Sequence, residues 1–236
     1  MKLERIRTTL QDFSAEHGHA NFVFTPADRT GIGMVAVTAA ALGQAGAASG
    51  LLVQSSDVEE VAFQVKFTLD GKPASGWLWF APFDNGDEVE VVVRWQDDHY
   101  NVVAMARPSD RTVALYPHLS RGGNAHWKAV WRLWFWAMTI FGGMSALLVI
   151  IIASIFNGGF QIEIAYVMGA VLIGMYIFFA LPAIQIGFQR MKFVRVAERA
   201  FRALGWKDVK NIDLPQSSKP RRPEDPAEFG TFYFRY

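Results

Sequence analysis

The chain has 236 residues, of which 51% are hydrophobic and 19% charged, and its mean hydropathy is +0.15. This composition excludes a disordered protein or one that coats nucleic acid, because both need few apolar residues and a strong excess of one charge. The absence of cysteine excludes disulfide frameworks, thiolate zinc sites and cysteine nucleophiles. The formal net charge of +1 hides one strongly acidic region and one strongly basic region.

Residues 1–30 are predicted to form a short N-terminal amphipathic segment. Leu3, Ile6, Leu10 and Phe13 recur at helical spacing, so a helix is expected over residues 1–16. The first twenty residues mix charges and contain no apolar stretch, and we therefore expect no cleavable signal peptide.

Residues 31–56 are rich in glycine and alanine and carry no charge. Seven alanines and five glycines over 31–53 make insertion into a membrane weaker than for a leucine-rich segment. A full span would also place the four basic residues of region 1–30 outside the cell, against the positive-inside bias. We interpret the segment as membrane-associated, entering the bilayer conditionally or packing on the later helices, with a full span as the alternative.

Residues 57–120 are predicted to form a small β domain. Five runs rich in β-branched and aromatic residues, separated by turn-forming residues, cover 61–69, 76–80, 88–95, 100–106 and 111–116. Five short strands predict a small antiparallel barrel of the SH3-like or OB-like kind. Residues 57–98 hold ten acidic residues against three basic ones, so nucleic acid is not expected as a partner.

Two long uncharged segments within residues 131–190 predict a transmembrane helical hairpin. They cover 133–156 and 164–189, and each contains 12 Leu, Ile, Val or Phe residues. A helix of the shorter length reaches ~36 Å, enough to cross a hydrocarbon core of ~30 Å. The short link at 157–161 makes the two helices antiparallel. The predicted fold class is therefore an α+β membrane protein.

Small residues give each predicted helix a face for close packing. The first helix carries Gly142 and Ala146, and the second carries Ala165 with Gly169 and Ala170 with Gly174. These residues could pack the hairpin on itself or on a second copy of the chain, and the sequence does not separate the two.

Four tryptophans gather where the first helix enters the predicted membrane: Trp127, Trp131, Trp134 and Trp136. Indole rings prefer the level of the lipid headgroups, so the cluster is interpreted as an aromatic belt. A stacking platform for a ligand is the alternative.

Basic residues predict the orientation of the hairpin. Arg121, Lys128 and Arg132 precede it and five more lie between Arg190 and Arg202, whereas the connecting loop has none. Positive charge stays on the cytoplasmic side of a membrane. We therefore expect a multi-pass protein of the bacterial inner membrane with both termini in the cytoplasm.

Residues 191–236 are predicted to contain a basic amphipathic helix, a Pro-rich linker and a C-terminal aromatic strand. Lys192, Arg195, Arg199 and Arg202 form a stripe at helical spacing beside an apolar stripe, which is typical of a helix lying on the anionic inner leaflet. An ordinary solvated helix, or one docked on the acidic β domain, is the alternative. The strand is expected to extend the edge of the β domain.

Groups that could carry catalysis are sparse. His17 and His19 lie two residues apart, but no third metal ligand is identifiable. Asp110, His118 and Ser120 could form a triad only by coincidence, because the serine lacks the context of a nucleophile elbow. We therefore expect no enzymatic activity, no metal and no cofactor.

Four segments resemble a proteobacterial family described as type VI secretion system effectors: 75–79 (SGWLW), 86–91 (GDEVEV), 106–118 (ARPSDRTVALYPH) and 229–236 (FGTFYFRY). The resemblance covers most of the chain, including the hairpin, and implies a role in competition between bacteria. It implies a non-enzymatic inner-membrane protein, either an effector that acts on membranes or an immunity or accessory protein whose β domain binds a partner. The expected partners are the phospholipid bilayer, a second copy, and a type VI component or a cognate effector or immunity protein.

Overall fold

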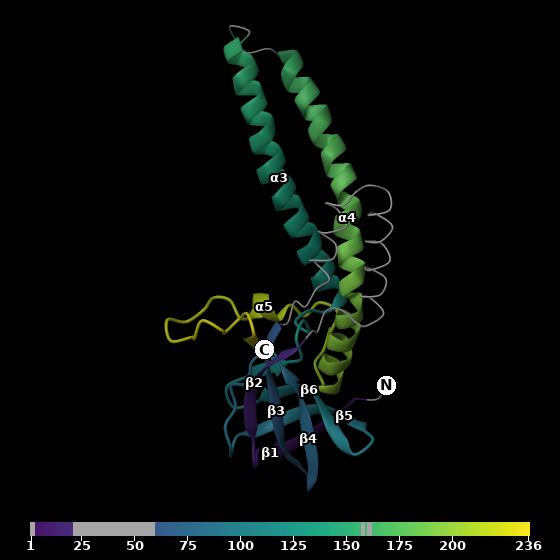
Figure 1. Cartoon of the computed structure of the whole chain (residues 1–236), viewed down its shortest axis with the longest axis vertical. Helices are drawn as coiled ribbons and strands as arrows, with labels where there is room; N and C mark the ends of the chain where they lie inside the picture. Colours follow the sequence, from purple (N-terminus) through teal and green to yellow (C-terminus); the bar gives the residue numbers. More distant parts are fainter. Residues whose placement is uncertain (1–2, 21–59, 157–158, 160–161) are drawn as a thin grey trace. The chain divides into compact units, whose positions relative to one another are not determined.

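The computed structural model describes residues 3–20, 60–156, 159 and 162–236. The chain divides into two units (Figure 1): the β unit, Met1–His118 with Leu214–Tyr236, and the hairpin unit, Leu119–Asp213. Together they give the α+β architecture that the sequence predicts. The membrane-associated segment expected at 31–56 lies outside the described residues.

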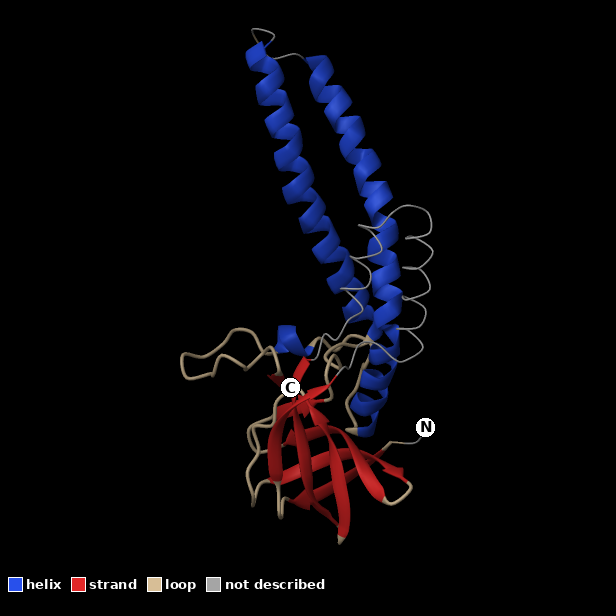
Figure 2. Ribbon diagram, in the orientation of Figure 1, coloured by secondary structure: helices blue, strands red, loops and turns tan. Residues whose placement is uncertain are grey.

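One mixed sheet of eight strands forms the β unit (Figure 2). Its strands are β1 (Glu4–Thr9), β2 (Ser14–Ala20), β3 (Glu60–Leu69), β4 (Lys72–Leu78), β5 (Glu88–Gln96), β6 (His99–Arg107), β7 (Thr112–Leu115) and β8 (Tyr233–Arg235). A short helix, α5 (Leu214–Ser217), precedes β8 in the chain. The five runs expected from the sequence correspond to β3–β7.

The strand order is β1-β5-β6-β4-β3-β2, and β7 joins β6 to β8. The start of β6 pairs in parallel with β4, whereas the end of β6 pairs antiparallel with β7. The expectation of a wholly antiparallel domain is therefore wrong. The tight β5–β6 hairpin fixes the direction of β6, and β6 then lies parallel to β4 at its other edge.

The predicted N-terminal helix is also wrong, because β1 and β2 occupy its residues. β1 pairs antiparallel with β5, and Arg7 Nε lies 2.7 Å from Glu88 Oε1 while Arg5 Nη1 lies 3.6 Å from Glu90 Oε2. Backbone pairing and cross-strand pairs of opposite charge outweigh the local helical spacing of apolar residues. The described part of residues 1–30 thus belongs to the β unit.

The core of the β unit is built from alternate residues of its strands. Val65, Phe67 and Leu69 of β3 belong to the same buried cluster as Val89, Val91 and Val93 of β5. This period of two is the one by which a strand turns one face to a core. Full burial of one such side chain contributes about 1.5–3 kcal/mol, so the cluster is the main source of stability for the sheet.

The C-terminal residues complete the β unit. β8 pairs antiparallel with β7, and Tyr233 and Phe234 are buried. Asp225 closes the Pro-rich turn before β8, because its carboxylate accepts the Arg222 N–H at 2.7 Å and an Arg235 Nη2 hydrogen bond at 3.0 Å. The hydrogen bond from the Arg222 backbone, followed by the one from Arg235, holds the pKa of Asp225 below its ordinary value.

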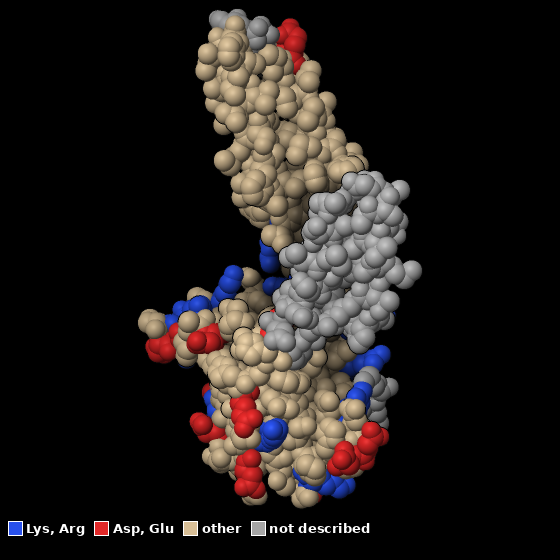
Figure 3. Space-filling model, in the orientation of Figure 1, with Lys and Arg blue, Asp and Glu red and all other residues tan. Residues whose placement is uncertain are grey.

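Two helices, α3 (Gly123–Phe156) and α4 (Ile162–Ala203), form the hairpin unit and run antiparallel beside one another (Figure 1). Both are long and apolar enough to cross a membrane. Their surface is uncharged over most of its length on the face seen in Figure 3. Pro182 lies inside α4 without ending it.

Candidate membrane interface

Close packing of small residues on α3 holds the middle of the hairpin. Gly142 and Ala146 are buried, and a Cβ on Gly142 would lie 2.9 Å from Leu172 Cδ2 of α4. Gly142 therefore lets the hairpin pack on itself. Gly169 and Gly174 differ, since among the described residues no atom lies within 4 Å of a Cβ added to either. The two glycines named on α4 are not part of this contact.

Three hydroxyl side chains of α3 inside the apolar stretch have partners within the hairpin. Thr139 Oγ1 and Tyr176 OH, 2.6 Å apart, join α3 to α4. The hydroxyls of Ser145 and Ser154 donate at 2.7 Å to carbonyl oxygens four residues earlier in α3. The exposed surface is lined instead by apolar side chains, among them Leu133, Phe141, Ile155, Ile173, Ile177 and Leu181. Such a surface suits lipid, which offers polar groups no hydrogen-bond partner.

At the open end of the hairpin, opposite the connecting loop, His126 and Trp127 near the start of α3 pack on Gly187 of α4. His126 is buried, and its Nε2 lies 3.0 Å from Gly187 O. A carbonyl only accepts, so Nε2 carries the hydrogen of this bond. A Cβ on Gly187 would lie 2.6 Å from Trp127 Cζ3, and the Trp127 ring also meets the Phe188 ring edge-on at 5.1 Å. Only glycine fits opposite this indole.

The N-terminus of α3 is closed by α4 and by the segment that follows α4. Gly123 N donates to Glu198 Oε1 at 2.9 Å. The N–H groups of Asn124 and Ala125 donate to Lys210 O at 2.9 and 3.2 Å. These bonds satisfy N–H groups that a first helical turn leaves without helical partners, and the Glu198 carboxylate suits the positive end of the helix dipole. The base of the hairpin is thereby fixed.

The structure divides the four tryptophans of the predicted belt into two kinds. Trp131 and Trp136 are 39% and 55% exposed. Trp134 is half-buried and meets the rings of Trp131 and Tyr176 edge-on at 5.4 and 5.2 Å. Its Nε1 is buried without a hydrogen-bond partner in the part of the chain that is described. Two rings are therefore exposed at the helix surface, while Trp127 and Trp134 hold α3 against α4.

The basic helix predicted from the sequence is the continuation of α4, which runs unbroken from Ile162 to Ala203. The basic residues Lys192, Arg195, Arg199 and Arg202 are exposed on it. The neighbouring apolar residues Val194, Ala197, Phe201 and Leu204 are buried in the protein. The position of this helix on the inner leaflet stays a prediction, but the apolar stripe that would enter the bilayer is packed within the protein.

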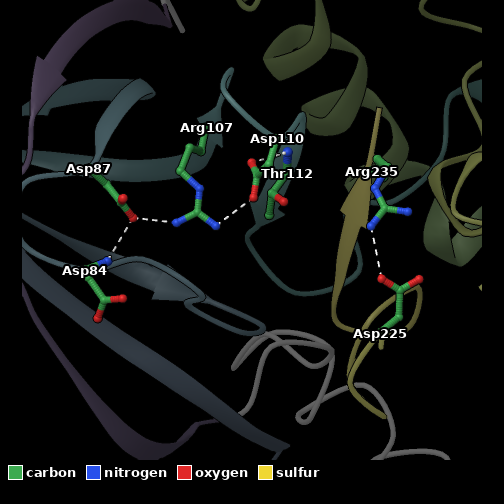
Figure 4. Close-up of polar contacts among 7 residues, drawn as sticks. All are labelled: Asp84, Asp87, Arg107, Asp110, Thr112, Asp225 and Arg235. Atoms are coloured by element: carbon green, nitrogen blue, oxygen red, sulfur yellow. Dashed lines mark hydrogen bonds and ion pairs between the residues drawn. The ribbon is translucent and has the colours of Figure 1, made fainter. Parts of the chain in front are cut away.

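In the β unit, Arg107 bridges two carboxylates (Figure 4). Its Nη1 contacts Asp87 and its Nη2 lies 2.8 Å from Asp110 Oδ2. Asp110 also accepts the Thr112 N–H at 3.1 Å. Burial by itself would raise the pKa of Asp110, but the hydrogen bonds from Arg107 and Thr112 outweigh it, so this pKa lies below its ordinary value. These contacts fix the turn between β6 and β7.

The conceivable triad of Asp110, His118 and Ser120 is not assembled. His118 Nε2 lies 2.7 Å from Glu60 Oε2, whereas Asp110 is engaged by Arg107. His17 lies on β2 with its ring 4.0 Å from that of Phe63. His19 is on the same strand, and no cluster of three or more potential metal ligands occurs in the described residues.

The contacts of His126 with Gly187 and of Glu198 with Gly123 were not found from the sequence, because each joins residues more than 60 positions apart. One signal was present: Glu198 is the single acidic residue in the otherwise basic stretch 190–207. Comparisons with protein-family models, curated proteins and solved structures found no match to this chain.

Proposed function

We propose that the chain is an inner-membrane protein in which α3 and α4 cross the bilayer as a hairpin. The exposure of their apolar surface carries the proposal: only 11% of the most apolar window of α3 and 0% of that of α4 is buried. A core helix of a soluble protein would be buried over most of its surface. The 12 Leu, Ile, Val or Phe residues of each span contribute roughly −4 to −7 kcal/mol to insertion.

Strand pairing supports an even number of crossings. β7 precedes α3 and β8 follows α4, yet the two pair in one sheet. Residues on both sides of the hairpin therefore lie on the same side of the membrane. Because the basic residues also flank the hairpin at that end, the β unit is cytoplasmic and the loop at 157–161 is periplasmic.

The biochemical role that this geometry favours is that of a non-enzymatic anchor for a partner-binding β unit. A path for water or ions through the bilayer needs a polar lining. The hydroxyls of Thr139, Ser145 and Ser154 instead have partners inside the hairpin. In the β unit, Asp110 and His118 are engaged in separate pairs rather than arranged for catalysis.

The resemblance described above supports association with a type VI secretion system, as an immunity or accessory protein. An effector of the same system that acts on membranes is the second candidate, because the family that the sequence resembles is described as type VI secretion effectors. In that case the hairpin would insert, self-associate and make the membrane leak.

Expression tests and vesicle assays distinguish the two roles. The anchor proposal predicts that the full chain is harmless when it is produced in the cytoplasm or exported, and that it leaves dye-loaded anionic vesicles intact at high protein load. Toxicity accompanied by dye release would establish the effector role instead. Membranes washed with alkaline carbonate test the shared premise, since a hairpin that spans the bilayer stays in the pellet.

A further inference from the structure

The basic residues near the hairpin lie at different heights along its axis. The Thr139–Tyr176 and His126–Gly187 contacts fix the register of α3 against α4. Arg132 is six residues from His126, so it lies level with the region of Pro182 on α4. Arg190 is about eight residues further along, a distance of ~12 Å at ~1.5 Å per residue. Lys128, one turn from Arg132 on α3, lies between these levels.

Arg132 and Lys128 lie within the height of the polar layer of a bilayer, and Arg190 lies ~5 Å beyond it. The interfacial region adds ~5–7 Å on each side of the hydrocarbon core, and Arg and Lys side chains extend their charges along the membrane normal. If Arg132 marks the edge of the hydrocarbon core, Lys128 lies ~6 Å closer to the cytoplasm, at the height of the phosphates. Arg190 lies on the cytoplasmic side of the phosphates, and its long side chain extends toward them. The exposed ring of Trp131 lies between Lys128 and Arg132 in sequence.

These three cations have no acidic partner among the described residues. Lys128, Arg132 and Arg190 are exposed, and no ion pair among the described residues involves any of them. By contrast, Arg121 is paired with Asp213 at 3.0 Å, and Arg202 Nη2 lies 3.9 Å from Glu198 Oε2. The described part of the chain thus leaves the positive charge at headgroup height uncompensated, and an anionic phospholipid is complementary to it.

The lower cations of α4 lie too far from the bilayer to contribute. Arg195, Arg199 and Arg202 are five, nine and twelve residues beyond Arg190. They therefore lie ~20, ~26 and ~30 Å from the level of Arg132, well outside a polar layer of ~5–7 Å. α4 does not bend back toward the membrane over this stretch, because Glu198 still contacts the start of α3 at Gly123. The screening length at physiological salt is ~8 Å, so attraction to the headgroups has largely decayed there.

We propose that Lys128, Arg132 and Arg190 form a cationic collar that binds the phosphates of anionic phospholipids in the inner leaflet, and that Arg195, Arg199 and Arg202 take no part. This inference rests on the proposed crossing of the bilayer. It names the lipid class that the hairpin selects, and it replaces the lower part of α4 as the membrane-binding surface.

The test compares two variants that each lose three positive charges. One carries Lys128→Gln, Arg132→Gln and Arg190→Gln, and the control carries Arg195→Gln, Arg199→Gln and Arg202→Gln. Full-length proteins are reconstituted into vesicles of equal parts phosphatidylglycerol and phosphatidylethanolamine and then re-extracted. Retained lipids are counted by native mass spectrometry, and circular dichroism checks that both variants keep their helices.

The wild type and the control should retain phosphatidylglycerol in preference to phosphatidylethanolamine, by about fivefold for each cation that contacts a phosphate. The collar variant should lose that preference. A wild type without preference, or an equal loss in both variants, would overturn the proposal. Carbonate extraction of the same membranes separates the two ideas: a protein that stays in the pellet but shows no lipid preference refutes only the collar, whereas a released protein refutes the proposed function.

Discussion

Replacing Gly187 by alanine tests the packing at the base of the hairpin. The added Cβ would lie 2.6 Å from Cζ3 and 2.7 Å from Cη2 of Trp127. Non-bonded carbon atoms in folded proteins do not approach one another this closely. A rigid indole cannot move aside as a flexible side chain can, so α4 must shift away from α3. That shift would also strain the hydrogen bond between His126 Nε2 and Gly187 O.

Two opposing effects set the magnitude. Overpacking of this kind costs about 1–3 kcal/mol, whereas glycine to alanine inside a helix gains about 0.8–1 kcal/mol. Gly169→Ala is the matched control on the same helix, because it has the gain without a neighbour in the described residues. We expect Gly187→Ala to be about 1–3 kcal/mol less stable than Gly169→Ala, which corresponds to a melting temperature about 2–12 °C lower.

The assay is thermal unfolding of the detergent-solubilised full chain, followed by circular dichroism at one scan rate. Trp127→Leu should remove most of the penalty of Gly187→Ala, so a double-mutant cycle should give a coupling of at least about 1 kcal/mol. The contact between Trp127 and Gly187 is refuted by either of two results. Gly187→Ala and Gly169→Ala could have the same melting temperature, or Gly187→Ala could cost the same stability in the Trp127→Leu background.

Three further predictions concern the β unit. Gly76→Ala should lower its stability by at least about 1–3 kcal/mol in chemical denaturation, because the added Cβ would lie 2.5 Å from the backbone oxygen of Val102; an unchanged midpoint would contradict the parallel β4–β6 contact. Asp110→Asn should lower the free energy of unfolding at pH 7. The difference from the wild type should narrow as the pH falls through the lowered pKa of Asp110, because the stabilisation by this carboxylate is fully present above its unfolded pKa and is lost on protonation. If the difference in unfolding free energy persists in acid, the hydrogen bonds that Asp110 accepts from Arg107 and Thr112, and not its charge, stabilise the fold. Phe234→Ala should cost about 3–5 kcal/mol in the same assay, because this β8 side chain is 1% exposed; a loss below about 1 kcal/mol would remove β8 from the core.

Several strands could be predicted because local residues determine them. Asp70 and Gly71 both have positive φ, as the Asp-Gly hairpin turn between β3 and β4 requires. In β5, Val89, Val91 and Val93 alternate with the less buried Glu88, Glu90 and Arg94, and only Val92 on the second face is also buried. The N-terminal strands could not be predicted, because Leu3, Ile6 and Leu10 fit a helical period as well as a strand. Only pairing with β5, whose partner residues lie 79 to 89 positions away in the chain, decides between the two.

The two long apolar helices were predictable from composition, because hydrophobicity over so long a stretch needs no partner to be recognised. Their contacts were predictable only in part. Gly142 lies against α4 as a small residue should, but Gly174 is equally small and has no such neighbour among the described residues. Which face of a helix meets its partner depends on the register between the two, and the sequence does not contain that register in readable form. The sequence also did not show that α4 continues without a break through Arg202, because the apolar span and the basic stretch differ in composition.

The most direct test of the account is the accessibility of single cysteines, since the chain has none of its own. Gly159→Cys places a thiol at an exposed position between α3 and α4, and Asp98→Cys places one in the exposed turn between β5 and β6. In intact spheroplasts, a membrane-impermeant maleimide should label position 159 and should reach position 98 only after the membrane is permeabilised. Labelling of position 98 from outside, or protection of position 159, would contradict a hairpin that crosses the inner membrane from the cytoplasm.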